Sequence, residues 1–298
     1  MSSTPPNAPG QMLGQHYRIE RELGHGGMAT VYLCTDVRSN LLVAVKVLRP
    51  ELGSVVTRER FFREIAFAAE LDHPRIPRVI DSGMAGQLPY YAMNFVDGES
   101  LRDMMNRERR LTIDELTRLS AAIAGPIAYA HERNIVHRDI KPENVLISGD
   151  KVYVLDLGVA RAIVDSGGER LTRTGITVGT PAYMSPEQVQ GTRDLDYRSD
   201  IYSLGCVVYE MLAGTPPFSA STPQLLMSAR FTRTPAPLKT IRDDVPPNVA
   251  QAVEKAMAYR PDDRWPSVEA FVDALIPPAA KATPSRRPTP RPSDASAC

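Results

Sequence analysis

HRDIKPEN at residues 137–144, followed by DLG at residues 156–158, constrains this 298-residue chain more tightly than any other stretch. A lone Asp or Asn most often caps a turn. Here Asp139, Asn144 and Asp156 follow one another closely, in company with basic side chains. The spacing of the three residues does not fit separate turn caps, so this stretch is the strongest candidate for a chemical site, provided that other segments supply a place to bind a substrate.

A glycine segment, LGHGGMATV at residues 23–31, is the first candidate for that place. Glycines let backbone N–H groups approach a phosphate without an intervening side chain. A Rossmann loop leads into a helix, whereas residues 30–34 continue as an alternating strand, and the Gly-Lys-Ser/Thr of a Walker loop is absent. Taken alone, the segment is equally compatible with an ordinary hairpin turn.

The first part of the chain has the periodicity of strands. Apolar residues alternate over residues 17–48, which predicts three antiparallel strands, and residues 90–96 predict another. Between them, residues 58–71 have helical spacing. Lys46 follows an apolar run, where a surface lysine is the usual interpretation, but Glu64 on the predicted helix can pair with it and hold the ammonium toward a bound phosphate.

From Asp97 onward the pattern becomes helical. Thr112 and Glu115 form a capping box at the start of an amphipathic run. A second helix is predicted from about Asp200 to Leu212, with Gly214 as its stop signal. The sequence therefore predicts a small sheet-rich unit with one helix, followed by a larger, mainly helical unit.

The amino-acid composition excludes several classes of protein and indicates where the chain ends are disordered. Lys plus Arg and Asp plus Glu both number 35, so nothing indicates a nucleic-acid surface. The three cysteines form no CxxC pair, which disfavours a disulfide framework or a zinc site and favours a reducing compartment. No apolar run is long enough to cross a membrane. Proline enrichment in residues 1–10 and 277–298 predicts disordered tails.

Further motifs follow those at 137–144 and 156–158 along the chain. They are GTPAYMSPE at 179–187, DIYSLG at 200–205 and Arg264. With these, the chain resembles the eukaryotic-type (Hanks-type) protein kinase family across about residues 17–275. The Gly-x-Gly-Gly-Met at 24–28 is similar to that of its bacterial serine/threonine kinases.

The resemblance implies an α+β, bilobal fold. Its expected parts are a disordered tail at 1–16, an antiparallel-sheet N-lobe with one regulatory helix at 17–96, a mainly helical C-lobe at 97–276, and a Pro/Arg-rich tail or linker at 277–298. The implied activity is transfer of the ATP γ-phosphate to Ser/Thr hydroxyls of proteins.

The resemblance also implies roles for the central motifs. Asp139 would orient the substrate hydroxyl and accept its proton, and Lys141 would stabilise the migrating phosphoryl group. Asn144 and Asp156 would bind Mg²⁺, or Mn²⁺ in its place. Lys46, paired with Glu64, would meet the phosphates.

The implied nucleotide site draws on both predicted units. Met93 is expected at the back of the pocket, backbone groups of Asn94 and Val96 at the adenine edge, and apolar side chains above and below the ring. The full expected set is Leu23, Gly24, His25, Gly26, Gly27, Met28, Ala29, Thr30, Val31, Ala44, Lys46, Met93, Asn94, Val96 and Leu146.

Regulatory and supporting residues are implied as well. Autophosphorylation is expected at Thr172 and Thr174, whose phosphates could pair with Arg138 and order the loop around them. Thr180 is expected on the substrate side. Three further residues are expected to support the C-lobe. Glu187 and Arg264 would form a buried ion pair, and Asp200 would cap its helix and hold the backbone of the loop that carries Asp139.

Two other classes stay open: a pseudokinase scaffold and a small-molecule kinase of related fold. The presence of Lys46, Asp139 and Asp156 argues against the first, and the segment 179–187 argues against the second. Expected partners are protein substrates, with homodimer formation during autophosphorylation as a further hypothesis. The expected location is the cytoplasm, either free or as the cytoplasmic portion of a longer membrane-anchored kinase.

Overall fold

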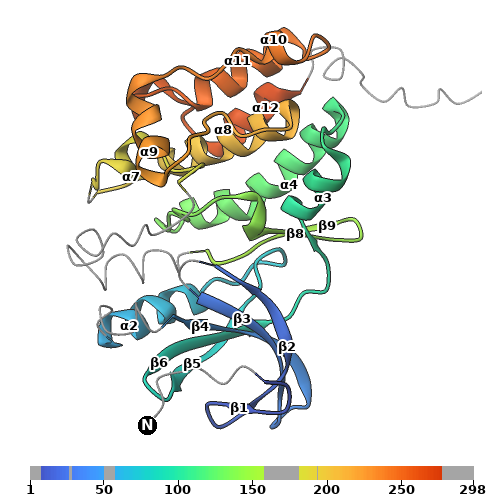
Figure 1. Cartoon of the computed structure of the whole chain (residues 1–298), viewed down its shortest axis with the longest axis vertical. Coiled ribbons are helices and arrows are strands. Elements are labelled where there is room, and N and C mark those ends of the chain that lie inside the picture. Colours follow the sequence, from blue (N-terminus) through green and yellow to red (C-terminus); the bar gives the residue numbers. More distant parts are fainter. Residues whose placement is uncertain (1–7, 27–28, 50–57, 158–180, 193, 277–298) are drawn as a thin grey trace, which may run out of the picture.

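The chain is built of a curled β-sheet lobe and a helical lobe joined by a short segment near residue 95 (Figure 1). The structure, a computed structural model, describes residues 8–26, 29–49, 58–157, 181–192 and 194–276. The predicted α+β, two-lobed architecture is confirmed.

The N-terminal lobe contains one antiparallel sheet of six strands in the order β1-β2-β3-β4-β6-β5. The three strands predicted within residues 17–48 and the later one near residue 90 are confirmed, whereas β1 and β5 were not foreseen. Their bounds are β1 (Met12–Leu13), β2 (Tyr17–His25), β3 (Ala29–Asp36), β4 (Leu41–Leu48), β5 (Val79–Ala85) and β6 (Leu88–Asn94).

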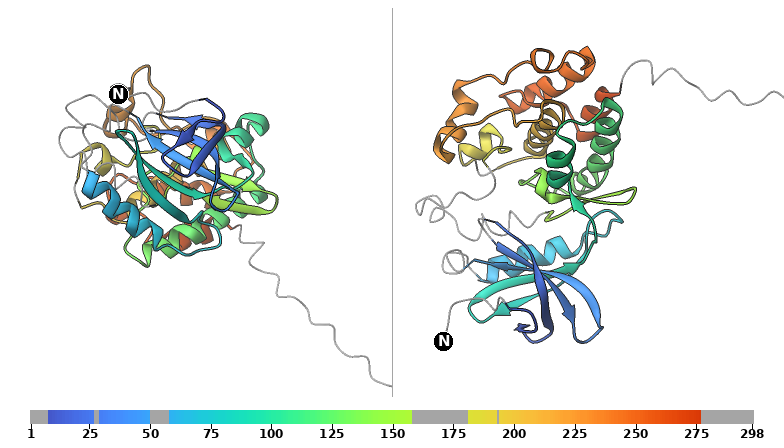
Figure 2. Two further views of the ribbon diagram at one scale, coloured as in Figure 1. Left: turned by 90° about the horizontal axis from the view of Figure 1, so that it is seen from below. Right: turned by 45° about the vertical axis from the view of Figure 1, so that its right-hand side comes forward.

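Successive side chains along β4 and β6 point to opposite faces of the sheet, and each face packs in a different cluster. Val45 and Tyr90 point into a cluster with the first strands, while Ala44 and Tyr91 point to the opposite face. Helix α2 (Arg58–Ala69) packs on that second face, on the side nearer the helical lobe (Figures 1 and 2). The predicted helix after β4 is therefore placed where it can reach the space between the lobes.

The expected N-terminal boundary at residue 17 is wrong. Met12 and Leu13 pair with Arg18 and Tyr17 in the register of β1 and β2. Leu13 is fully buried, and burial of an apolar side chain in the sheet core explains why this segment is ordered. The folded lobe thus begins before residue 12.

The C-terminal lobe is mainly helical and carries a second, three-stranded sheet on the side of the first lobe. Its strands are β7 (Glu99–Ser100), β8 (Val145–Ser148) and β9 (Lys151–Val154). Its helices are α3 (Leu101–Glu108), α4 (Ile113–His131), η1 (Pro142–Asn144), α7 (Pro186–Val189), α8 (Arg198–Ala213), α9 (Pro223–Thr232), α10 (Leu238–Ile241), α11 (Pro247–Ala256), η2 (Pro261–Asp263) and α12 (Val268–Leu275).

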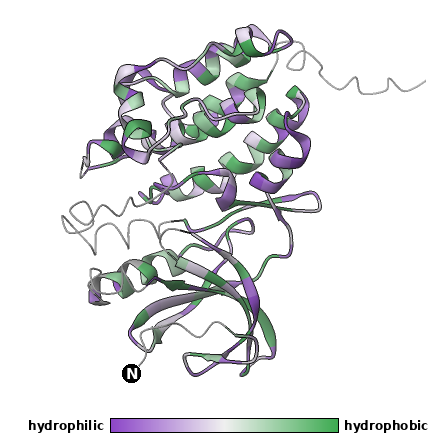
Figure 3. Cartoon of the chain, in the orientation of Figure 1, coloured by the Kyte–Doolittle hydropathy of each residue, from purple (hydrophilic) through white to green (hydrophobic). Residues whose placement is uncertain are grey.

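Helix α8 lies at the centre of this lobe. Every residue from Ser199 to Ala213 is buried, and α4, α11 and α12 pack around it. The peripheral α3, by contrast, is largely hydrophilic (Figure 3).

The predicted start of α4 and the predicted end of α8 are both confirmed. Thr112 and Glu115 form the capping box of α4, and Gly214, at φ 77°, ends α8 in the left-handed conformation that glycine adopts without strain. Within the described ranges, no helix is long and apolar enough to cross a membrane.

Candidate active site

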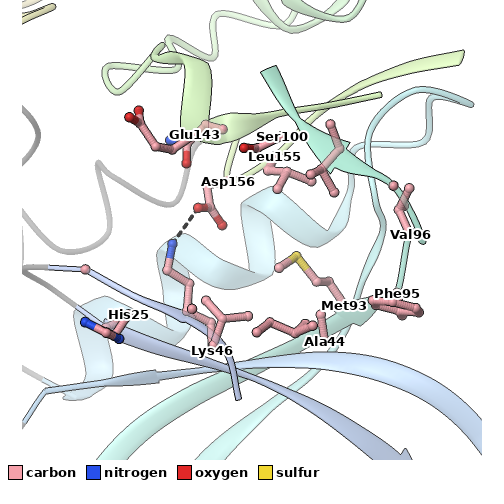
Figure 4. Close-up of a pocket in the computed structure, with 18 of the residues that line it drawn as sticks. His25, Ala44, Lys46, Met93, Phe95, Val96, Ser100, Glu143, Leu155 and Asp156 are labelled. Carbon is pink, nitrogen blue, oxygen red and sulfur yellow. Dashed lines mark hydrogen bonds and ion pairs between the residues drawn. The ribbon is translucent and has the colours of Figure 1, made fainter. Parts of the chain in front are cut away.

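A cleft of about 590 Å³ lies between the two lobes, a volume that suits a nucleotide-sized ligand. Its walls come from the glycine segment, β3, β4, the segment after β6, and the loop of residues 137–144 before β8, which the sequence predicts to be the catalytic loop (Figure 4). The structure therefore gathers motifs that are more than 100 residues apart into one site, as the pair of Lys46 and Asp156 illustrates.

Most of the predicted nucleotide-binding residues line this cleft. Apolar contact surface comes from Val31, Ala44 and Leu146, and the connecting segment contributes Met93 and the residues after it. The predicted lining residues found there are Leu23, Gly24, His25, Gly26, Ala29, Val31, Ala44, Lys46, Met93, Asn94, Val96 and Leu146. Thr30 lies on β3 outside the lining set, and Gly27 and Met28 fall outside the described residues.

Lys46 contacts the carboxylate that follows β9. Its Nζ lies 2.5 Å from Oδ2 of Asp156, and the pair is drawn in Figure 4. Burial alone would raise the pKa of the Asp156 carboxyl, but the charge and hydrogen bond of Lys46, aided by the Tyr91 hydroxyl, hold that pKa below its ordinary value. Glu64 lies on α2, but its side chain is outside the described part of the structure, so its pairing with Lys46 stays a prediction.

The catalytic loop places Asp139 against two side chains that follow it. Lys141 Nζ donates to Asp139 Oδ2 at 2.7 Å, and Asn144 Nδ2 donates to the same oxygen at 3.0 Å and to the Asp139 carbonyl at 2.8 Å. The single turn η1 begins at Pro142, whose fixed φ favours a helical start, and carries Asn144 back toward Asp139. The predicted group is thus assembled by a local turn.

The donors around Asn144 and Asp156 fit a small, hard divalent cation. Because Asn144 uses its amide nitrogen on Asp139, only its amide oxygen can act as a metal ligand. No group of three or more His, Cys, Asp or Glu residues in the described ranges could hold a metal by itself. Two protein oxygens suit Mg²⁺, which commonly takes its other ligands from phosphate and water.

Asp200 fixes the backbone of the catalytic loop from α8. Its carboxylate accepts the N–H of His137 at 2.8 Å and of Arg138 at 2.9 Å, and lies 2.8 Å from Nε2 of His131. Burial would raise the pKa of this carboxyl, but the hydrogen bond and charge of His131 keep it below the ordinary value. The expectation that Asp200 also caps its helix is wrong, because α8 begins earlier, after Tyr197.

Glu187 and Arg264 form the predicted ion pair beneath the site. Two bonds of 2.6 and 2.8 Å join the carboxylate to the guanidinium, and Ser199 donates to Glu187 at 2.7 Å. Arg138 has its carbonyl bound by the Gln188 side chain at 2.7 Å, which links the catalytic loop to α7. The expected residues Thr172, Thr174 and Thr180 lie outside the described residues.

Sequence reasoning missed several residues of the site. Glu143 lines the cleft and accepts a hydrogen bond from Arg102, which also contacts Glu210 at 2.8 Å. Ser100 and Asp103 line it too, and their spacing as an N-cap pair was the available signal. No sequence signal pointed to Tyr91, whose hydroxyl donates to Asp156 Oδ1 at 2.6 Å.

These features define a class of protein with a two-lobed fold and a nucleotide-sized cleft between the lobes. In the cleft a lysine of one lobe contacts an aspartate of the other, beside a loop that carries Asp139, Lys141 and Asn144. The comparisons with known proteins agree. The family described as "Protein kinase domain" matches residues 17–291, so the chain belongs to this family.

Curated relatives narrow the subfamily to Hanks-type bacterial serine/threonine kinases. The chain is 40% identical over 261 residues to "Serine/threonine-protein kinase PknB" of Mycolicibacterium smegmatis, covering 86% of this chain and 41% of that protein. It is 38% identical to a probable serine/threonine-protein kinase of Streptomyces coelicolor, covering 86% and 39%. The chain thus spans about two fifths of the length of these relatives.

Solved structures agree on the fold. The crystal structure of the Mycobacterium tuberculosis PknI kinase domain in a cysteine-to-alanine variant has a TM-score of 0.72 and 30% identity, covering 91% of this chain and 98% of that one. A double mutant of the same domain has a TM-score of 0.74 and 29% identity, with the same coverage.

Proposed function

We propose that this chain is a protein-serine/threonine kinase that transfers the γ-phosphate of ATP to Ser/Thr hydroxyls of proteins. The observation that carries the proposal is the convergence of Lys46, Asp139 and Asp156 on one interlobe cleft, in a chain that belongs to the protein kinase family. A scaffold that only binds partners needs none of these three groups, and no feature of the described residues favours it.

Cofactor binding is assigned to the two halves of the cleft. ATP would lie with its adenine between Ala44 and Leu146 and its phosphates toward Lys46. Asn144 and Asp156 would hold Mg²⁺, or Mn²⁺ in its place, and the metal when bound neutralises charge on the phosphates. Phosphoryl transfer depends mainly on positioning and charge neutralisation, and a lysine with two metal-binding oxygens supplies groups of both kinds.

Asp139 is the residue proposed to handle the substrate proton. Lys141 and Asn144 hold its carboxylate through Oδ2, so Oδ1 can accept the hydrogen of a Ser or Thr hydroxyl and aim the hydroxyl oxygen into the cleft. Lys141 then lies close enough to stabilise the charge of the transferred group.

The direct test is phosphate transfer from radiolabelled ATP to a generic protein substrate, comparing the natural chain with Asp139→Asn and Lys46→Ala. We expect transfer to fall by at least about a hundredfold in Asp139→Asn, the lower end of the usual contribution of a positioned acid–base group. Transfer that persists equally in both variants would refute the assignment.

Activation by autophosphorylation at Thr172 and Thr174 is part of the proposal. A phosphate there adds about −1.5 to −2 charge, which basic residues such as Arg138 can bind. Mass spectrometry after incubation with ATP tests this, with Asp139→Asn as the inactive control. Unmodified Thr172 and Thr174 in the active chain would contradict it.

Homodimer formation during autophosphorylation is proposed as a separate step, because one copy must present its threonines to the cleft of another if transfer is intermolecular. A light-scattering series across concentration measures the association. An autophosphorylation rate per molecule that is independent of concentration would argue against it.

We further propose that the kinase acts in the cytoplasm, either free or as the cytoplasmic portion of a longer membrane-anchored kinase. Two observations support this: Cys34 and Cys206 are buried free thiols, and the curated relatives are more than twice as long as this chain. Fractionation of cells expressing the natural gene, with detection of the kinase part, tests it.

A further inference from the structure

Tyr91 occupies an unusual position for a phenol. It lies on β6 directly opposite Lys46 of β4, so both side chains extend from the same face of the sheet. Its ring is fully buried in the cluster between the sheet and α2, with Phe61, Ile65 and Met93. Burial of a hydroxyl in such an apolar cluster is costly unless it is hydrogen-bonded, and its acceptor is the carboxylate of Asp156.

The Asp156 carboxylate is therefore held at both oxygens by the N-terminal lobe. Lys46 Nζ contacts Oδ2 at 2.5 Å, and the Tyr91 hydroxyl donates to Oδ1 at 2.6 Å. Hydrogen bonds to a charged acceptor are stronger than neutral ones, and two donors fix the direction of the carboxylate as well as its position.

The backbone at Asp156 needs such support. Its φ of 60° lies in the left-handed region, which Asp tolerates better than most residues but at a cost in free energy. A strained residue keeps its conformation only where the surroundings determine it. Contacts from two adjacent strands of the other lobe provide that determination.

We propose that Tyr91 is a positioning residue: its buried hydroxyl orients the Asp156 carboxylate for the metal that accompanies the nucleotide. This inference rests on the proposed function, since it assumes that Asp156 binds that metal. Lys46 cannot replace Tyr91 in this role, because it contacts the other carboxylate oxygen and is itself assigned to the phosphates. Removal of the hydroxyl should therefore weaken metal binding more than nucleotide binding.

The test uses the full chain with Tyr91→Phe, which keeps the ring and removes only the hydroxyl. Calorimetric titrations with ADP, in EDTA and at graded Mg²⁺ concentrations, measure nucleotide affinity and the Mg²⁺ concentration that gives half of its metal-dependent gain. We expect ADP affinity in EDTA to stay within about twofold, and the half-saturating Mg²⁺ concentration to rise about tenfold, as the loss of one hydrogen bond to a charged group implies.

Tyr90→Phe is the matched control. Tyr90 is the preceding residue of β6, is buried on the opposite face and packs edge-on against Tyr17 with ring centroids 5.8 Å apart. An equal rise in the required Mg²⁺ in both variants would show general loosening of the sheet and overturn the inference. A urea unfolding curve for each variant verifies that the chains compared are folded.

Asp156→Asn supplies a second measurement. If Tyr91 acts through Asp156, adding Tyr91→Phe to Asp156→Asn should not change ADP affinity at any Mg²⁺ concentration. A natural chain whose ADP binding does not depend on Mg²⁺ would overturn the assigned metal site together with this inference. Normal metal dependence in Tyr91→Phe, beside a functional natural chain, would overturn the inference alone.

Discussion

Arg264 is a buried charge of the C-terminal lobe whose guanidinium is hydrogen-bonded on every nitrogen. Its side chain is fully buried, and its five N–H groups reach both oxygens of Glu187 and the carbonyls of Arg198, Ala258 and Tyr259. Such a geometry compensates the loss of hydration that burial imposes on the guanidinium. The pair therefore fastens α7, which contains Glu187, to the segment around Arg264 that precedes α12.

Substitution Arg264→Met should lower the free energy of unfolding by about 3–5 kcal/mol, because Glu187 would be left as a buried charge without its partner. Urea denaturation followed by circular dichroism measures this. The control is Arg107→Ala, which breaks an ion pair with Glu99 whose side chains are 56% and 37% exposed, and it should leave the unfolding curve unchanged. A similar small change in both variants would contradict the expected role of Arg264.

Asp200 makes the free energy of unfolding depend on pH, and the environment of its carboxylate sets the sign of that dependence. Its pKa is lower in the folded chain than the value of about 3.9 expected when unfolded, so the unfolded chain binds the proton more readily. The stabilisation is complete well above pH 4 and is lost as the pH falls toward the folded pKa. Urea unfolding between pH 7 and pH 3 should show this loss, and Asp200→Asn should show a shallower one. Equal slopes would contradict the assignment.

At the scale of single elements, short-range signals were the reliable ones. The capping box at Thr112 and the helix end at Gly214 could both be predicted from the sequence, because they depend on neighbours within one turn. Strand β5 was missed, since its run VIDSGMA contains Asp81, Ser82 and Gly83, which favour turns, and its order comes from pairing with β6. Propensity was outweighed there by tertiary contacts.

The start of α4 offers a test at this scale. Thr112 Oγ1 accepts the backbone N–H of Glu115 at 3.2 Å, and the Glu115 carboxylate accepts the Thr112 N–H at 3.0 Å. Thr112→Ala should lower the free energy of unfolding by about 1 kcal/mol, because the backbone N–H of Glu115 loses its side-chain acceptor at the start of the helix. Thr117→Ala is the control: its hydroxyl bonds the Ile113 carbonyl within the helix, and its removal should be nearly neutral. The ranking of the two by thermal melting checks the prediction.

Across the whole molecule, the sequence predicted which residues would share the cleft better than it predicted their contacts. Asp139, Asn144 and Lys141 were foreseen as a group because they lie within one loop. The pair of Lys46 with Asp156, and the Tyr91 hydroxyl beside it, join strands of one lobe to a loop of the other. Contacts of that kind depend on how the lobes close, and no local pattern encodes them.

The N-terminal edge of the sheet is where sequence composition misled most. Residues 1–16 were expected to be a tail, because the first ten are rich in proline. Yet Gly10 donates its N–H to the Ile19 carbonyl at 2.7 Å, and Ile19 donates to the Gln11 carbonyl at 2.9 Å. These bonds set Leu13 into the cluster formed with Tyr17 and Tyr90, so the segment belongs to the core of the lobe.

Two shortened chains test whether residues 8–13, which include β1, stabilise the fold while the chain ends outside residues 8–276 do not. A chain of residues 8–276 should unfold at the same urea concentration as the full chain, since the removed ends were predicted to be disordered. A chain of residues 14–276 loses β1 and Leu13, and should be less stable by at least about 2 kcal/mol, the value of burying one leucine side chain. Leu13→Ala in the longer chain should reproduce most of this loss. Coincident unfolding curves for residues 8–276 and 14–276 would show that β1 contributes nothing to the stability of the sheet.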